Sequence, residues 1–128
     1  VAPMVYPSHY PPNYNGWPNP NHVPGPIVKF AMTRAVERAN MLERKESGYD
    51  NAIVATSTAS TTPARPPFVP TGKYAKKLRP WLQDFDYGKD YTAEDVRAQI
   101  KATYDSGLDS WMMWDPRNVY TPSAYLAE

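Results

Sequence analysis

Acidic and aromatic side chains stand at the ends of two apolar stretches of this chain. The stretch over residues 78–85 carries Asp84 near its end, and the stretch over residues 108–115 ends in Trp114 and Asp115. Two carboxyl groups can cleave a glycosidic bond when one protonates the leaving oxygen and the other attacks the sugar or activates water. An indole ring can stack on the apolar face of a sugar. These residue types therefore indicate chemistry on carbohydrate.

Asp84 is the candidate catalytic carboxylate. The alternative role is a structural acid that caps the following loop or binds Arg79. Asp86 shares a face with Asp84 if the strand continues, and the plainer interpretation places Asp86 in a turn. Gln83 alternates with Asp84, so a regular strand points the two side chains to opposite faces. Gln83 therefore either binds a sugar hydroxyl or satisfies backbone groups, and both interpretations stay open.

His9 and Tyr6 follow an earlier apolar segment and are candidate substrate-binding residues. A histidine can orient a carboxylate or bind a hydroxyl group, and a structural hydrogen bond is the alternative. A single histidine with no second ligand nearby is poor evidence for a metal, so we predict neither a metal nor a cofactor. Ser8 is not expected to be a nucleophile because no Gly-x-Ser-x-Gly elbow surrounds it.

Four tryptophans are the candidate platforms for a sugar ring. Trp114 is closest to a strand end and is the preferred one. Trp111 lies three residues earlier, which places it on the opposite side of a strand, and together with Trp81 it is expected in the core. Trp17 lies in a Pro/Asn-rich loop and either forms a wall of the binding site or only holds that loop together. Arg117 either contacts substrate or lies in a solvated loop.

These side chains must be positioned by strands and helices that the sequence pattern also predicts. Residues 2–9, 78–85 and 108–114 read as strands, because they are short, apolar and bounded by turn residues. Residues 26–45 read as a helix that buries Val28 and Leu42 on one face, with Pro26 in its first turn. A second helix begins at Thr92 as N-cap, with Asp95 three residues later, buries Val96, Ile100 and Tyr104, and ends at Gly107.

Strands that alternate with helices predict an α/β fold with a parallel sheet. Three strands alone leave two long unpaired edges, so we expect the chain to be one portion of a larger domain. Residues 48–77 are weakly specified. Ala52–Ala55 could form a short strand or a helical turn, and residues 57–70 read as a tolerated surface insertion or a lid over substrate. Residues 123–128 could begin a last helix.

Composition excludes several classes of function. The 128 residues carry a net charge of +1, which gives no electrostatic case for binding nucleic acid. No run of about 20 apolar residues is present, so we expect no membrane span. No signal peptide is visible, although one could have been removed. Cysteine is absent, which excludes disulfides and thiolate metal sites and leaves the compartment open.

Three blocks of sequence resemble a bacterial family of glycoside hydrolase domains. The blocks are Val5–Pro11, Arg79–Phe85 and Trp111–Trp114, and the resemblance runs in order over nearly the whole chain. The family is similar to the (β/α)8-barrel glycosidases. The resemblance implies that the three strands are the sixth to eighth of a barrel, so that the chain is a partial TIM barrel. Asp115 stands where the family pattern has an amide.

The resemblance also implies an activity. The full-length protein would be a glycosidase acting on a polysaccharide or oligosaccharide, in which Asp84 is one catalytic carboxylate and the second comes from another strand. The isolated chain would then be inactive. The missing amino-terminal half of the barrel or a second copy would cover its open edges. An extracellular or cell-envelope location is what the resemblance favours.

Two other classes of function remain open. A non-catalytic carbohydrate-binding or scaffold domain of the same ancestry needs aromatic platforms but no pair of carboxylates. An interaction module whose Pro/Tyr-rich loops bind protein is the third interpretation. An acid at the end of a parallel strand in the missing half would favour the enzyme.

Overall fold

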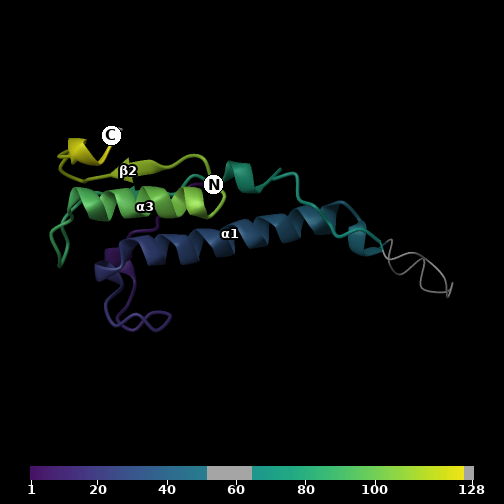
Figure 1. Ribbon diagram of the computed structural model, residues 1–128, viewed down its shortest axis with the longest axis horizontal. Coiled ribbons are helices and arrows are strands. Elements are labelled where there is room, and N and C mark those ends of the chain that lie inside the picture. The colour runs from purple at the N-terminus through teal and green to yellow at the C-terminus, as the bar shows by residue number, and fades with distance from the viewer. Residues whose placement is uncertain (52–64, 126–128) are drawn as a thin grey trace.

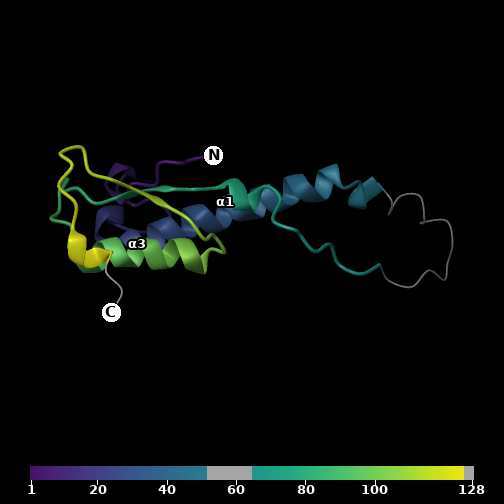
Figure 2. The same cartoon turned by 90° about the horizontal axis from the view of Figure 1, so that it is seen from above.

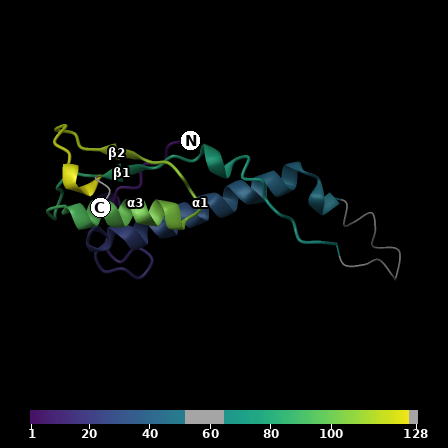
Figure 3. The ribbon, with the colours of Figure 1, turned by 45° about the horizontal axis from the view of Figure 1, so that its top comes forward.

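The computed structural model describes residues 1–51 and 65–125, and these form a mixed helix and strand structure with a parallel sheet, as predicted (Figure 1). The strand or helical turn predicted for Ala52–Ala55 lies outside the described residues, as do most of the predicted surface insertion and the end of the last helix. The two long helices, α1 and α3, lie side by side on one face of the sheet (Figures 1 and 3).

Both helices begin and end where the sequence pattern indicates. Helix α1 is Pro24–Glu46, and two prolines occupy its first turn, where a missing N–H costs little. Helix α3 is Ala93–Asp105, and Thr92 and Asp95 form the predicted capping box. Gly107 follows with a φ of +85°, a left-handed conformation that glycine adopts without strain. The predicted capping signals are therefore confirmed.

The sheet is shorter than predicted. Strand β1 is Trp81–Gln83 and strand β2 is Met112–Trp114, and they pair in parallel with Gln83 opposite Trp114. The predicted strand over residues 2–9 is wrong for most of its length. Within it, Met4 forms an isolated parallel bridge with Trp81, and Pro7–His9 is a 3₁₀ turn, η1. Pro7 has no N–H to donate to a ladder, which explains the early end.

A helix side chain takes over where that ladder stops. The amide of Gln99 accepts from the backbone N–H of Gln83 at 2.9 Å and donates to the Gln83 carbonyl at 2.8 Å. Both glutamines are fully buried. An unpaired backbone group in this position would cost free energy, so Gln99 replaces the strand partner that residues 6–9 do not supply.

The core lies between the two helices and the sheet. It is built from apolar side chains of the N-terminal segment, α1, β1, α3 and the segment before β2: Val5, Val28, Met32, Leu82, Ala102 and Leu108. Two predicted core positions on the helices are wrong. Leu42, in the carboxyl-terminal half of α1, is exposed, and Tyr104, near the end of α3, is exposed as well. Val96 and Val28 are buried as predicted.

The carboxyl-terminal half of α1 binds residues 71–73, where the chain returns to the helix after the segment over residues 47–70. The carboxylate of Glu43 accepts from the Thr71 hydroxyl at 2.6 Å and from the Thr71 backbone N–H at 2.7 Å. A third bond comes from the Lys73 backbone N–H at 3.1 Å. These hydrogen bonds lower the pKa of Glu43. The chain therefore leaves α1 and returns to it at a fixed point.

The strands and helices run in opposite directions, as βα units require. The N-termini of α1 and α3 lie at the same end of the molecule as the carboxyl ends of the strands (Figure 2). The 3₁₀ turns η1 and η4 (Pro122–Ala124) are at this end as well. Among the described residues, no helix combines the length and apolarity that a membrane crossing needs.

Candidate functional site

The carboxyl ends of β1 and β2 bring the predicted site residues of both strands together. The backbone N–H of Asp84 donates to the carbonyl of Trp114 at 3.0 Å, one residue beyond the last pair of the ladder. Asp84 and Trp114 are therefore neighbours on adjacent parallel strands. This confirms the parallel order on which their association depended.

The carboxylate of Asp84 is buried and fully engaged. It accepts from the Thr121 hydroxyl at 2.7 Å, from the Thr121 backbone N–H at 2.8 Å, and from the Tyr125 hydroxyl. The residue is 4 % exposed. Burial, followed by this hydrogen bond and the charge of Asp84, raises the pKa of the Tyr125 phenol, so the phenol is a donor at neutral pH. Asp84 thus holds the segment after β2 against the strand ends, a structural role in a loop other than the one that follows Asp84 in the sequence.

Asp115 holds the beginning of the same segment. Its carboxylate accepts from the Arg117 backbone N–H at 2.6 Å and from the Arg117 guanidinium at 3.2 Å. Burial raises the pKa of Asp115, but the hydrogen bonds from Arg117 outweigh burial and bring the pKa below its usual range. Arg117 also reaches Asp86 at 3.6 Å. Two buried aspartates, one after each strand, therefore fix one loop.

Asp86 lies in the irregular, bent segment that follows β1. One of its carboxylate oxygens accepts from the Tyr91 backbone N–H at 2.8 Å, and the residue is exposed. Asp86 therefore binds the backbone of its own loop and also stands beside the Arg117 guanidinium.

Aromatic rings from the N-terminal segment and the loop after β1 form a cluster beside these acids. Tyr6 packs edge-on against His9 at 5.3 Å between centroids and against Phe85 at 5.4 Å. His9 lies 6.1 Å from the ring of Tyr87. His9 and Tyr87 are exposed, whereas Tyr6 and Phe85 are buried. The cluster presents an imidazole and a phenol to solvent above a buried aromatic base, which suits contact with a sugar ring.

Gln83 joins the cluster to β1. Its side-chain oxygen accepts from the Ser8 hydroxyl at 2.8 Å and from the Ser8 backbone N–H at 3.2 Å, and its nitrogen donates to the Phe85 carbonyl at 2.9 Å. The side chain is fully buried. The structure therefore shows Gln83 satisfying polar groups of the protein, and a contact between Gln83 and sugar stays a prediction.

The two strand tryptophans meet edge to face. The rings of Trp81 and Trp114 lie 6.0 Å apart at an interplanar angle of 81°, and Trp114 is 43 % exposed. Trp111 stacks on Tyr125 instead, at 6.1 Å, and its indole N–H donates to the Tyr104 hydroxyl at 3.1 Å. Trp114 therefore has the exposure that a stacking platform needs. Trp111 is partly buried and packs against the core as predicted, whereas Trp81 is only partly buried.

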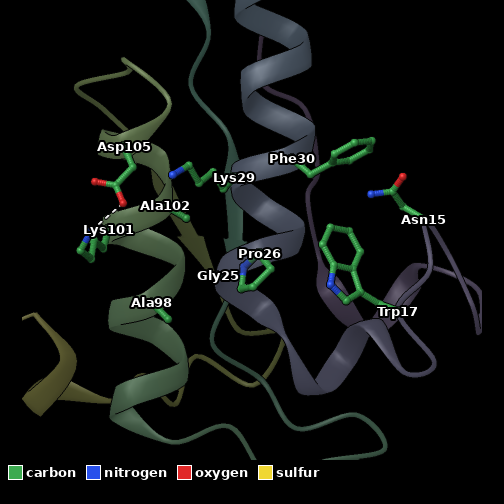
Figure 4. A pocket seen from close by; sticks show the side chains of 10 residues that line it. All are labelled: Asn15, Trp17, Gly25, Pro26, Lys29, Phe30, Ala98, Lys101, Ala102 and Asp105. Carbon is green, nitrogen blue, oxygen red and sulfur yellow. Dashed lines mark hydrogen bonds and ion pairs between the residues drawn. The ribbon is translucent and has the colours of Figure 1, made fainter.

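Trp17 lies apart from the strand-end residues. It packs edge-on against Phe30 of α1 at 5.9 Å. Together the two rings border a hollow of about 590 Å³ between the loop over residues 13–17, the start of α1, and α3 (Figure 4). Trp17 therefore lies in this hollow and not at the strand ends. The predicted site residues that the structure does bring to the strand ends are Tyr6, His9, Gln83, Asp84, Trp114 and Asp115.

Three residues at the site were not singled out by sequence reasoning: Gln99, Thr121 and Tyr125. Thr121 and Tyr125 lie in a loop without regular periodicity, so nothing in the pattern paired them with Asp84. Gln99 did carry a signal, because a polar residue three positions after Val96 falls within the apolar face of the predicted helix. No group of three or more potential metal ligands occurs within residues 1–51 and 65–125.

Part of the chain matches a known family of protein domains. Residues 49–120, more than half of the 128-residue chain, match the family described as "Putative glycosyl hydrolase domain". The matched region contains β1, α3 and β2, and with them Asp84, Trp114 and Asp115. Searches of curated proteins and of solved structures find no match.

Proposed function

Because the chain belongs to the family described as "Putative glycosyl hydrolase domain", we propose that it forms the carboxyl-terminal portion of a barrel glycosidase that cleaves a polysaccharide or oligosaccharide. The observation that carries this proposal is the pairing of the Asp84 backbone with Trp114 at the ends of two parallel strands. In barrel enzymes the carboxyl ends of the strands carry the chemistry.

The open face of the sheet supports a barrel. Helices α1 and α3 cover one face, which buries Val5 and Leu82. Met4, Trp81 and Met112 are in register and therefore point to the other face. Met4 is 72 % exposed on that face. A barrel strand is covered by helices outside and by apolar side chains inside, so the open face is where we place the remaining strands. Residues 1–128 would then supply strands six to eight, with an insertion over residues 48–77.

We assign the residues at the strand ends to substrate as follows. Trp114 offers its indole face to a sugar ring. His9 and Tyr6 line the site from the N-terminal segment, and Gln83 and Asp115 support it from beneath, where each fixes neighbouring backbone. A bound sugar would lie between the exposed rings of Tyr87 and Trp114, which are the most solvent-accessible aromatic groups at this end.

Asp84 is the proposed catalytic carboxylate. Its three donors fix its position, and a fixed carboxylate is what protonation or attack at a sugar carbon requires. Substrate reaches Asp84 when the Thr121–Tyr125 segment, which now occupies both oxygens, makes room. The partner carboxylate would come from a strand of the barrel other than β1 and β2.

A second function is favoured by a specific observation. Asp84 is 4 % exposed and its oxygens are occupied by protein donors, which is the arrangement of a structural acid. A carbohydrate-binding domain without catalysis would keep the exposed rings of Trp114 and Tyr87 and need no free carboxylate. Both the glycosidase and the carbohydrate-binding domain would bind carbohydrate, but only the glycosidase would cleave it.

The test is hydrolysis and binding measured together on the intact protein with a panel of defined oligosaccharides. Release of reducing ends supports the glycosidase, and loss of this activity in Trp114→Ala would place the site at the strand ends. The matched control is Trp111→Ala, since Trp111 stacks on Tyr125 rather than facing the open side. Binding without cleavage of any substrate would favour the carbohydrate-binding domain.

A further inference from the structure

A second aromatic surface lies away from the strand ends, in the hollow that runs from the loop over residues 13–17 across the start of α1 to α3. Its volume of about 590 Å³ falls within the range of small-molecule sites. Figure 4 shows the rings of Trp17 and Phe30 on one side of α1, the α3 side chains on the other, and Pro26 between them. None of the strand-end candidates lines this hollow.

The floor of the hollow exists because the two helices approach closely at one point. A Cβ atom on Gly25 would lie 3.3 Å from both the Cβ and the carbonyl oxygen of Ala98. Gly25 and Ala98 therefore let α1 and α3 pack with little between them, and the small residues Ala98 and Ala102 leave the space above the contact open. Larger side chains at these positions would fill it.

The charges at the rim have an excess of one positive charge. Lys101 pairs with Asp105 at 2.5 Å, which leaves Lys29 uncompensated. Lys29 is exposed and makes no ion pair within residues 1–51 and 65–125, although its charge helps lower the pKa of Asp105 after the hydrogen bond from Lys101 and against burial. Figure 4 shows its ammonium group directed toward α3, over the hollow.

We propose that this hollow is an accessory binding site for an acidic oligosaccharide. Trp17 is half-buried and supplies an aromatic face for a pyranose ring. Asn15 supplies an amide that binds hydroxyl groups, and Lys29 pairs with the carboxylate of a uronic acid. The ligand class rests on the proposed function, but the site needs no catalysis. Such a site would hold a long substrate while its other end reaches the strand ends.

The experiment measures binding of a trigalacturonic acid probe and of a neutral trisaccharide, cellotriose, to the intact protein. We expect tighter binding of the acidic probe, with a shift of the Trp17 indole N–H signal in the NMR spectrum. Trp17→Ala should weaken binding about fivefold to tenfold, the loss that one aromatic contact of about 1 kcal/mol gives. Lys29→Glu, an exposed change that leaves the fold intact, should abolish the preference for the acidic probe.

Tyr104→Ala is the matched control, because it removes an exposed aromatic ring that does not line the hollow and has no proposed role at the strand ends. Equal binding of both probes by the parent protein, or unchanged binding of the acidic probe by Trp17→Ala and Lys29→Glu, would overturn the accessory site. Hydrolysis of glycans by those same variants would still support the proposed function, so the two failures are distinguishable.

Discussion

The backbone N–H of Asp84 bonds to the carbonyl of Trp114, while the Asp84 carboxylate bonds to Thr121 and Tyr125 beyond β2. The residue thus contacts the second strand through its main chain and the following loop through its side chain. Any change at Asp84 therefore acts on the loop as well as on chemistry, and experiments at this position need variants that separate the two.

The pair of hydrogen bonds from Gln99 to the Gln83 backbone should carry much of the stability of the sheet. Gln99→Ala leaves a buried N–H and a buried carbonyl without partners, and each costs about 1–3 kcal/mol. We expect the free energy of unfolding to fall by roughly 2–6 kcal/mol, measured by denaturant titration. Lys101→Gln, on the exposed face of the same helix, should change it by less than about 0.5 kcal/mol. Similar losses in both variants would contradict the role of Gln99.

The capping box at the start of α3 should contribute a smaller part of the stability, which can be measured independently of Gln99. The Thr92 hydroxyl accepts from the Asp95 backbone N–H, and the Asp95 carboxylate accepts from the Thr92 backbone N–H. Thr92→Ala should lower the free energy of unfolding by about 1 kcal/mol. Thr92→Ser keeps the hydroxyl and should restore most of that loss. If serine were no better than alanine, the hydroxyl would not be the stabilising group.

Acid should weaken the contact between Glu43 of α1 and residues 71–73. Hydrogen bonds from Thr71 hold the pKa of Glu43 below its ordinary value in the folded chain. A lowered folded pKa contributes stability that is present above the unfolded value and is lost as the pH falls through the folded one. We therefore expect amide-exchange protection of Thr71 and Lys73 to decline in acid, as the pH falls from the ordinary pKa of a glutamate through the lowered pKa of Glu43.

Two variants check the assignment of this effect to Glu43. Glu43→Gln should lose protection at neutral pH and show a flatter dependence on pH, because its side chain does not ionise. Glu37→Gln, on an exposed part of α1, should behave like the parent. Parent-like protection in Glu43→Gln would show that other contacts hold residues 71–73 against α1.

Local signals predicted the helices well and the strands poorly. Thr92, Asp95 and Gly107 mark the ends of α3 by chemistry that acts within a few residues, so sequence alone places them. The backbone of Gln83 at the end of β1 is bonded by the side chain of Gln99, which is 16 residues away. The predicted first strand ends early because Pro7 has no N–H to donate, and the Gln99 side chain takes the place of a strand partner. Tertiary contacts of this kind leave no periodic pattern.

The site was predictable where strand ends define it and unpredictable where loops complete it. Asp84 and Trp114 follow from the position of two apolar runs, and their parallel pairing brought them together as expected. The bonds from Thr121 and Tyr125 to Asp84 join a strand end to an irregular segment 37 and 41 residues later. Only the folded chain shows that these donors occupy the carboxylate.

The most direct test of the account compares turnover of Asp84→Asn with turnover of Tyr125→Phe in the intact protein, on whichever glycan the panel identifies. Both variants disturb the bond between Asp84 and the loop, and only the first removes the carboxylate. A catalytic Asp84 predicts a loss of about 10²- to 10⁴-fold for Asp84→Asn and less than about tenfold for Tyr125→Phe. Equal, small losses in both variants would contradict catalysis by Asp84 and leave it a residue that positions the loop.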